Sequence, residues 1–388
     1  MTIEYGTKIL AKKNPSRCEF SALVIARGAN INAVGCVDSP IVFTSDQKRS
    51  RAGDWAGLVL LGKGFVSTSE EVEFPGEFLA PFFPDEKKYY GGGGCNTDDE
   101  DFSGVLQFIR IEYAGSKQAG IVAIGVGNKT MIESVEVAVS GSNSYAFLGG
   151  AVGNNRMLAF GSKLNDFYYE RGYQACNTQQ VAIRVTMVGP GEDRNSIYAR
   201  STYWKATSKY ARRTLLRTKN ATLIGYDTEL GTPALGSAIL NANGATTRMY
   251  NTVATGFKNA VEVKQGNRNA PDFCPYVVED IACDSILPFI ESMHLVVADT
   301  PETKIAKSNF LSDVQLAKWI AGGFNGGGFN QQGGGLNIRI PYGVERADIR
   351  ALKAADNYNS VGTATIGAGR VPWNFLDEEW VRRDFSQY

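Results

Sequence analysis

Four consecutive acidic residues, Asp98, Asp99, Glu100 and Asp101, are the best candidates for a metal site in this chain of 388 residues. They follow the run GGGGCN, so carboxylates and loop carbonyl groups lie close together in the sequence. Calcium takes about six to eight oxygen ligands, which such a segment can supply. The spacing is not that of an EF-hand, because the alternating ligands and the terminal Glu are absent. A solvated acidic loop without a metal is the alternative interpretation.

Charged residues within two apolar segments are the candidates for acid–base chemistry. Glycosidases need two positioned carboxylates, whereas lyases need a base such as Lys or Arg and a cation that neutralises the substrate carboxylate. On neighbouring stacked strands, Arg110 and Glu112 would lie beside Glu133 and Glu136. Outward positions of such strands are polar in any case, so a salt-bridged ladder without a catalytic role is the alternative.

Aromatic and basic side chains gather in the irregular segment 190–213, and two Phe residues interrupt the glycine-rich segment 322–337. Aromatic rings and Arg side chains can stack on sugars or on bases. The candidates for ligand contact are Tyr203, Trp204, Tyr210, Arg213, Phe324 and Phe329. Packing against the flank of the fold is the alternative role for the first group.

His294 is the only histidine, so any mechanism with a histidine base would depend on it; a partly buried histidine without function is the alternative. The chain has six cysteines, and none forms a CxxC pair. A Cys/His zinc site is therefore not indicated. Cys274 and Cys283 flank a short segment and are the first pair to test for a disulfide, with buried free thiols as the alternative.

The composition limits the classes of partner. Lys+Arg and Asp+Glu both total 40, so no overall positive charge attracts nucleic acid. The 43 glycines suit a turn-rich β architecture, because Gly adopts positive φ at corners without steric cost. No apolar run reaches the ~18 residues of a membrane span. The N-terminal segment lacks the basic and apolar parts of a signal peptide.

The elements that carry these residues repeat along the chain. Segments 105–115, 130–141 and 156–160 alternate apolar and polar residues and then break at Gly, Ser or Asn. With Ile109, Val135, Leu158 and Ile183 as markers, the steps are 26, 23 and 25 residues. A strand-bearing unit that recurs at such a period indicates a solenoid, since one unit cannot cover its own apolar face. The sequence therefore predicts a right-handed parallel β-helix, an all-β solenoid.

Two regions follow from this pattern. Residues 1–305 are predicted to form the β-helix, with surface insertions at about 63–103 and 190–213. Residues 306–388 are predicted to form a small mixed C-terminal cap or assembly region with the glycine-rich loop 322–337. Segments 308–321 and 344–356 have helical spacing, and the tail 371–385 is aromatic and amphipathic. A solenoid end needs such a cap because it exposes strand edges and apolar core.

Several motifs together resemble a known family. MTIEYGTKI, ALVIARGANINAVG, SPIVFTSDQ, GDWAGLVLLG, GVLQFIRIEYAG and NATLIGYDT…YNTVATGFKNAVEV occur in this order over residues 1–290. They are similar to right-handed parallel β-helix proteins of Bacteroidota, known as surface proteins or lipoproteins. The resemblance implies export and a location outside the cell, and it implies no particular enzyme activity.

The chain departs from that family at two places. Members usually carry a signal and a further coil before the first motif, whereas here Met1 directly precedes it, so the first coil is expected to be short with an open edge. Members also carry an aspartate-rich run, DDxFDxDxGY. This chain keeps Asp166, Phe167, Gly172 and Tyr173, with Tyr168, Tyr169 and Arg171 among them. A calcium or carbohydrate role of that run is not expected here.

These observations favour a noncatalytic extracellular structural or adhesive protein that associates with itself through solenoid ends or loops. The expected partners are further copies of the chain and surface glycans, the expected location is extracellular or the outer cell surface, and calcium is the one cofactor considered. Two alternatives stand beside this prediction. One is a carbohydrate-active β-helix enzyme, a polysaccharide lyase or hydrolase. The other is a surface or fibre protein of a phage virion, which fits an initiating Met without an export signal.

Overall fold

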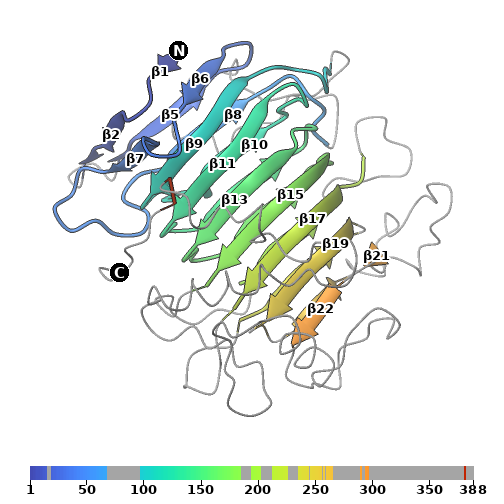
Figure 1. Cartoon of the computed structure of the whole chain (residues 1–388). Helices are drawn as coiled ribbons and strands as arrows, with labels where there is room; N and C mark the ends of the chain where they lie inside the picture. The colour runs from blue at the N-terminus through green and yellow to red at the C-terminus, as the bar shows by residue number, and fades with distance from the viewer. Residues whose placement is uncertain are drawn as a thin grey trace.

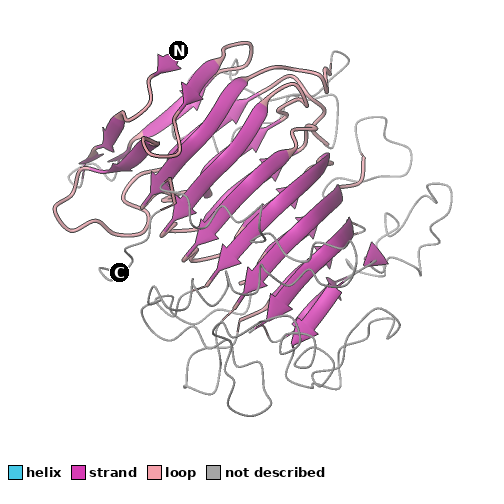
Figure 2. Cartoon of the chain, in the orientation of Figure 1, coloured by secondary structure: helices cyan, strands magenta, loops and turns pink. Residues whose placement is uncertain are grey.

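The computed structural model describes residues 1–14, 19–67, 97–184, 194–201, 212–225, 235–243, 245–255, 257, 259–264, 289–290, 293–296 and 380–381. Every regular element within these residues is a β-strand, and the strands stack in rows along the molecule (Figure 2). The helices expected at 308–321 and 344–356 lie outside the described residues.

The larger of two main sheets has twelve strands among the described residues. Its main path runs β1–β6–β9–β11–β13–β15–β17–β19–β21, with β2 on β7, β7 on β9, and β22 on β19 (Figure 1). The strands are β1 (Thr2–Ile3), β2 (Lys8–Ala11), β6 (Ile31–Val34), β7 (Ile41–Ser45), β9 (Gly104–Glu112), β11 (Met131–Ala138), β13 (Asn154–Phe160), β15 (Gln174–Ile183), β17 (Leu215–Ile224), β19 (Thr246–Thr255), β21 (Phe289–Ile290) and β22 (Met293–Val296).

The second sheet has eight strands, in the order β20–β18–β16–β14–β12–β10–β8–β5. These are β5 (Ala22–Ile25), β8 (Gly57–Leu61), β10 (Ala119–Ile124), β12 (Asn143–Leu148), β14 (Phe167–Glu170), β16 (Ile197–Arg200), β18 (Ser237–Ala242) and β20 (Asn259–Lys264). A short antiparallel pair, β3 (Lys13–Asn14) with β4 (Glu19–Phe20), lies outside both sheets.

From β8 to β20 the chain alternates between the two sheets, and each strand pairs in parallel with the strand one coil earlier. A parallel strand can return to the same sheet only through a crossover, and such crossovers are right-handed. This winding is the right-handed parallel β-helix that the sequence predicted.

The long strands of the twelve-stranded sheet each cover two sides of the coil. β6 pairs with the first half of β9, and β7 pairs with the second half. Between the halves, Phe108 has a φ of 52°, in the left-handed region. The same position on the next three coils is Ser134, Arg156 and Gln179, with φ values of 55°, 56° and 54°. A single left-handed residue per coil therefore makes this corner.

Aromatic rings fill the interior of the middle coils. Tyr145 stacks on Phe167 with ring centroids 5.1 Å apart, and Phe147 stacks on Tyr169 at 5.3 Å. All four side chains are fully buried. The Tyr145 hydroxyl lies 2.8 Å from the carbonyl oxygens of Val135 and Leu158 on two neighbouring strands, which share its single proton. Burying an aromatic or large aliphatic side chain stabilises a fold by about 1.5–3 kcal/mol, so this stack anchors neighbouring coils to each other.

Three asparagines form a ladder where the chain enters the eight-stranded sheet. The Asn165 side chain donates to Asn143 Oδ1 at 2.9 Å, and the Asn195 side chain donates to Asn165 Oδ1 at 3.2 Å. The backbone N–H of Ser237 continues the ladder by donating to Asn195 Oδ1 at 2.8 Å. The ladder fixes the start of each strand, because buried backbone and amide groups must be paired.

The register corrects two of the four markers of the predicted repeat. Ile109 lies opposite Val135, as expected, but Val135 lies opposite Met157 rather than Leu158. Ile183 pairs with Phe160, two residues beyond Leu158. Leu158 and Ile183 lie on the outer side of the sheet, whereas Met157 and Ala182 belong to the interior core. Both markers were misassigned because these outer positions are also apolar.

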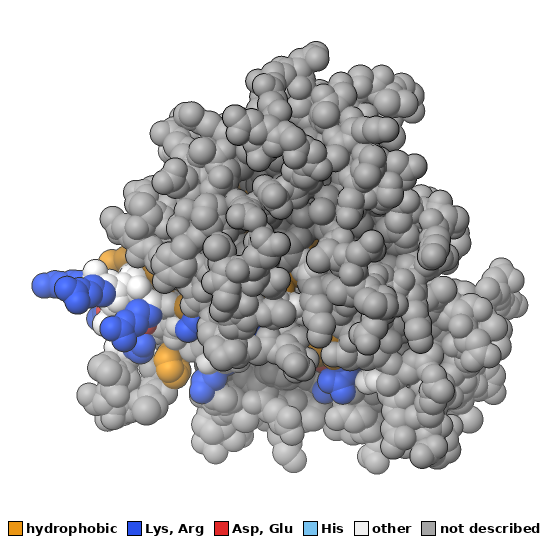
Figure 3. All heavy atoms as spheres, turned by 90° about the horizontal axis from the view of Figure 1, so that it is seen from below, with side chains coloured by type: hydrophobic (Ala, Val, Ile, Leu, Met, Phe, Trp, Pro, Cys, Tyr) orange, Lys and Arg blue, Asp and Glu red, His pale blue; other side chains and the backbone are white. Residues whose placement is uncertain are grey.

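The outer surface differs between sheets and between sides of the molecule. On the eight-stranded sheet, outward residues such as Val59, Ile124 and Leu148 form a second buried apolar cluster. On the face drawn in Figure 3, described Lys and Arg side chains lie at the left edge and at separate places along the lower part.

Candidate functional site

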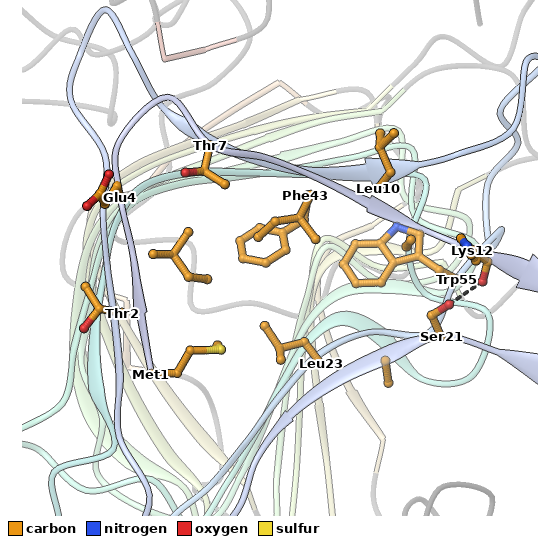
Figure 4. A pocket seen from close by; sticks show the side chains of 14 residues that line it. Met1, Thr2, Glu4, Thr7, Leu10, Lys12, Ser21, Leu23, Phe43 and Trp55 are labelled. Carbon is orange, nitrogen blue, oxygen red and sulfur yellow. Dashed lines mark hydrogen bonds between the residues drawn. The ribbon is translucent and has the colours of Figure 1, made fainter.

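An open cavity of about 680 Å³ lies at the end of the solenoid that carries the N-terminus. Figure 4 looks into it, with Phe43 and Trp55 in the middle and the first coil around them. Its wall is largely apolar and includes Ile3, Ile9 and Leu23, which pack against the main core. This cavity is the interior of the first coil, open to solvent.

Among the described residues, the strands around the cavity are the last in their sheets. Within this part of the chain β1 pairs with β6 alone, and β5 is the end of the eight-stranded sheet. Beside them, the side chains of Met1, Tyr5 and Leu10 are 56%, 66% and 56% exposed. Apolar side chains next to strand edges that pair on one side only form a surface on which another strand can dock.

The floor of the cavity is built by the GDW part of the sequence. Trp55 is buried, stacks against Phe43 with centroids 6.4 Å apart, and donates from Nε1 to the Glu112 carbonyl oxygen at 2.8 Å. Gly53 precedes it with a φ of 83°, which suits glycine at this corner. The hydrogen bond from Trp55 to Glu112 connects this floor to β9.

Asp54 holds three segments together beside that floor. Its carboxylate accepts from Lys13 Nζ at 2.9 Å, from the Ser45 hydroxyl at 2.8 Å and from the Arg51 backbone N–H at 2.8 Å. Burial acts to raise the pKa of Asp54, but these hydrogen bonds and the Lys13 charge outweigh it and lower the pKa. The carboxylate therefore has a structural role and stays ionised near neutral pH.

The acidic run 98–101 does not converge on a common centre. Asp99 pairs with Arg212 and accepts from the Phe65 backbone N–H at 2.8 Å, while Glu100 pairs with Lys129 at 3.0 Å. Asp101 is buried and accepts from the Ser103 hydroxyl at 2.9 Å, and Asp98 Oδ1 accepts from the Glu100 backbone N–H. Among the described residues, no three His, Cys, Asp or Glu side chains are arranged to hold a metal ion. The four carboxylates have separate partners, and the calcium site stays a prediction.

The expected ladder of charges forms only in part. Arg110 lies opposite Glu136 on the neighbouring strand, as expected. Glu112 lies opposite Ala138, accepts from the Thr44 hydroxyl at 2.9 Å and is buried. Glu133 lies opposite Gln107, on the other side of the corner residue Ser134. The three carboxylates do not come together as a catalytic pair. The corner separates Glu133 from Glu112 and Glu136.

Of the remaining candidate residues, Arg213 and His294 lie within the described part of the chain. Arg213 is buried, and burial lowers its pKa; its backbone carbonyl accepts from Gln174 Nε2 at 2.9 Å. His294 lies in β22 opposite Val253. Outside the described residues lie Tyr203, Trp204, Tyr210, Phe324, Phe329, Cys274 and Cys283. These ligand-contact and disulfide predictions stay predictions.

The segment that replaces the aspartate-rich run serves the fold. Asp166 is fully buried and accepts from Arg184 Nε at 2.9 Å, and Arg184 Nη1 donates to the Ser162 carbonyl oxygen at 3.0 Å. Burial raises the pKa of Asp166, and the Arg184 charge opposes that rise. Arg171 makes a corner with a φ of 60°. A buried ion pair of this kind fixes two neighbouring coils relative to each other.

The sequence carried a signal for the asparagine ladder that the prediction missed. NSY at 143–145, NDF at 165–167 and NSI at 195–197 each place Asn two residues before the first interior residue of a strand. Recurrence of Asn at a fixed distance before an apolar strand is the pattern to look for.

Stacked parallel strands, left-handed corner residues that recur from coil to coil and internal side-chain ladders define the protein as a parallel β-helix. The profile of the pectate-lyase-like β-helix domain matches residues 1–313. The chain belongs to that family, which covers the larger part of its length. Comparison with curated proteins and with solved structures gives no match. In the described part of the chain, no helix is long and apolar enough to cross a membrane.

Proposed function

We propose that this β-helix is a noncatalytic structural or adhesive protein that acts outside the cell and associates with further copies of itself through the open end of the solenoid. The observation that carries the proposal is the apolar cavity of about 680 Å³ between the strand edges of the first coil. Burial of apolar area drives association, and an edge strand provides backbone groups for pairing.

The chemistry of the opening fits a protein surface better than a small polar substrate. Leu10 and Met1 project beside the cavity, and Ile3 and Leu23 line it. The polar groups that line it, such as Glu4 and Lys12, lie on the first coil. An apolar core with a polar rim is the usual anatomy of a protein–protein interface.

The family match and one outer row of side chains favour a second candidate, a carbohydrate-active enzyme. Glu133 Oε1 accepts from Asn155 Nδ2 at 3.2 Å, and Gln107 Nε2 lies 3.5 Å from Glu133 Oε2. These half-buried groups on three successive strands offer hydrogen bonds to an extended sugar chain. The row has one carboxylate, whereas hydrolysis uses two, so it supports binding more than turnover.

Sedimentation velocity over a wide concentration range tests the proposed function. The chain is expected to form larger species as concentration rises, and Leu10→Lys is expected to weaken that association by about tenfold or more, because a charge would be desolvated at the interface. Met131→Lys is the matched control, since Met131 is 46% exposed but lies on β11, away from the open end. It should associate like the unchanged chain.

Two results would overturn the proposal. One is a monomer at every concentration, and the other is equal association of the Leu10→Lys and unchanged chains.

The same preparations are also incubated with a panel of acidic polysaccharides, on which no turnover is expected. Turnover that is lost in Glu133→Gln would establish the second candidate instead.

A further inference from the structure

Exposed cations recur at the corner where the chain leaves the twelve-stranded sheet for the eight-stranded sheet. On four successive coils the loops at this corner follow β7, β9, β11 and β13, and they are residues 46–56, 113–118, 139–142 and 161–166. Figure 1 shows the ends of β9, β11 and β13 side by side along one edge of the molecule. All Lys and Arg residues of these loops are exposed, and together they are called the basic edge: Lys48, Arg49, Arg51, Lys117 and Lys163.

Backbone hydrogen bonds hold the four loops in a row. The Ala114 carbonyl oxygen accepts from the Gly53 N–H at 3.1 Å and from the Gly141 N–H at 2.8 Å. The Lys163 N–H donates to the Ser140 carbonyl oxygen at 3.0 Å. Neighbouring strands are about 4.8 Å apart, so the row extends about 14 Å along the solenoid. The cations therefore lie along a line that the winding of the chain determines.

The carboxylates of the same loops leave this charge almost uncompensated. Asp54 and Asp166 are buried and pair with Lys13 and Arg184, which are not part of the basic edge. Asp46 is the one exposed carboxylate of the four loops. In the part of the chain that the structure describes, the ion pairs include none of the five cations of the basic edge. The corner thus carries a local positive charge on a chain whose total charge is zero.

We propose that the basic edge is an interaction surface for an anionic lipid bilayer, against which the solenoid lies with this corner. The cations project from loops of three different coils, whereas a site for a small ligand needs polar groups that converge in a concave pocket. Lipid headgroups move in the plane of the bilayer and can gather along a row of cations. Each Lys or Arg near an anionic bilayer adds to the attraction.

The other side chains of the loops favour a bilayer over a nucleic acid or a sugar polymer. Proteins that bind such polymers stack bases or sugar rings on exposed aromatic side chains. The aromatic residues of the four loops are Trp55 and Tyr113, which are 2% and 7% exposed. They are not available for stacking, so charge is what the basic edge offers. The proposal goes beyond the proposed function, because it concerns one corner of the solenoid and not its open end.

Vesicle flotation of the full chain tests the proposal. The chain is expected to float with phosphatidylcholine vesicles that contain about one third phosphatidylglycerol and not with pure phosphatidylcholine vesicles. Salt at about 1 M, where the Debye length is about 3 Å, should release it. Arg49→Glu/Lys163→Glu should weaken binding about tenfold or more, and Arg49→Gln/Lys163→Gln should bind between that variant and the unchanged chain.

Lys63→Glu/Lys129→Glu is the matched control, because it changes the net charge by the same amount. Both residues are exposed and lie at corners where the chain returns to the twelve-stranded sheet. The ion pair of Lys129 with Glu100 is on the surface, so its loss costs little. The control should bind vesicles like the unchanged chain, and far-UV circular dichroism should show the same β signal for all variants.

Four results would contradict the proposal. The unchanged chain does not float with the anionic vesicles, or it floats equally with the neutral ones. The control loses as much binding as Arg49→Glu/Lys163→Glu, which would mean that net charge and not the basic edge decides. Dissolved poly-glutamate binds as tightly as the vesicles and is lost in the same variant, which would make the basic edge a general polyanion site.

Discussion

At the scale of single residues, Asp54 shows how a buried carboxylate can serve the fold rather than a reaction. It accepts hydrogen bonds from the β2–β3 side, from β7 and from its own corner, through Lys13, Ser45 and Arg51. Hydrogen bonds to charged groups are worth about 1.5–3 kcal/mol each when buried, and the loss of one partner leaves the others unpaired. Asp54 is therefore a point at which acid should weaken the first coils.

The lowered pKa of Asp54 gives a sign to that effect. Between the native pKa and the unfolded value near 3.8, the unfolded chain binds more protons than the native chain. The contribution of Asp54 to the free energy of unfolding is therefore present above about pH 3.8 and is lost as the pH falls through the native pKa. Asp54→Asn removes this titration and is expected to cost about 1–2 kcal/mol at neutral pH.

Urea unfolding at several pH values between neutral and strongly acidic conditions measures both effects. The unchanged chain should lose more stability on acidification than Asp54→Asn. Asp38→Asn is the control, because Asp38 is exposed and has no such hydrogen bonds among the described residues. An equal acid sensitivity of the Asp54→Asn and unchanged chains would contradict the assigned role.

The sequence identified GDWAGLVLLG as one of several family motifs. In the structure it forms a corner with Gly53 at positive φ, followed by β8. The link from Asp54 to Lys13 spans 41 positions in the chain, so it follows from the winding and not from local pattern. The four acidic residues 98–101 illustrate the reverse case. These residues are adjacent in the sequence, but in the structure each has its own hydrogen-bond or ion-pair partners.

At the scale of elements, the corner between the two halves of each long strand determines the register. Phe108, Ser134, Arg156 and Gln179 all adopt left-handed φ values there. The same column continues in register to positions 220 and 251, which are both Asn. Asn and Gly tolerate this conformation best, whereas other residues store strain of about 1 kcal/mol or more.

Ser134 is the corner residue with the most to gain from replacement. Its φ is 55°, its side chain is fully buried, and its hydroxyl has no hydrogen-bond partner in the structure as described. Ser134→Gly removes both the strain and the unpaired hydroxyl, at a cost in chain entropy. The variant is expected to raise the free energy of unfolding by about 1 kcal/mol.

The measurement is the urea midpoint of Ser134→Gly beside that of Ser144→Gly. Ser144 is also buried, but its φ is not positive and its hydroxyl is hydrogen-bonded to Ser162. The control variant should therefore be destabilised. A lower midpoint for Ser134→Gly would show that the corner is not strained.

The strands were predictable to within a few residues, and the exact register was not. Segments 105–115, 130–141 and 156–160 correspond to β9, β11 and β13. The alternation of inward and outward residues restarts at each corner, because the left-handed residue interrupts the pleat. Leu158 is an outward residue that is both apolar and 1% exposed, so it imitated a core residue. The sequence pattern could not separate an interior residue from a buried outward one.

At the scale of the whole molecule, the described coils contact mainly their immediate neighbours. β12 lies between β10 and β14, and the interior rings of Tyr145 and Phe147 contact rings on β14 and the following corner. The free energy of unfolding of such a stack is approximately the sum of the stability of each coil and of the interfaces between neighbouring coils. A coil at the open end has one neighbouring coil, whereas a coil in the middle has two. Destabilising a middle coil therefore weakens two interfaces.

Phe147→Ala tests whether the stack behaves in this way. Phe147 is fully buried and contacts Tyr145, Tyr169 and Tyr173, so its removal leaves a cavity in the middle coils. The cost is expected to be about 3–5 kcal/mol in the free energy of unfolding.

Hydrogen exchange followed by mass spectrometry should accelerate most in β10, β12 and β14 and least in β5, at the end of their sheet. Phe102→Ala is the control, since Phe102 is 46% exposed and its loss should leave exchange unchanged. Equal acceleration in all strands would mean that the described coils unfold as one cooperative unit, and the nearest-neighbour account would then fail.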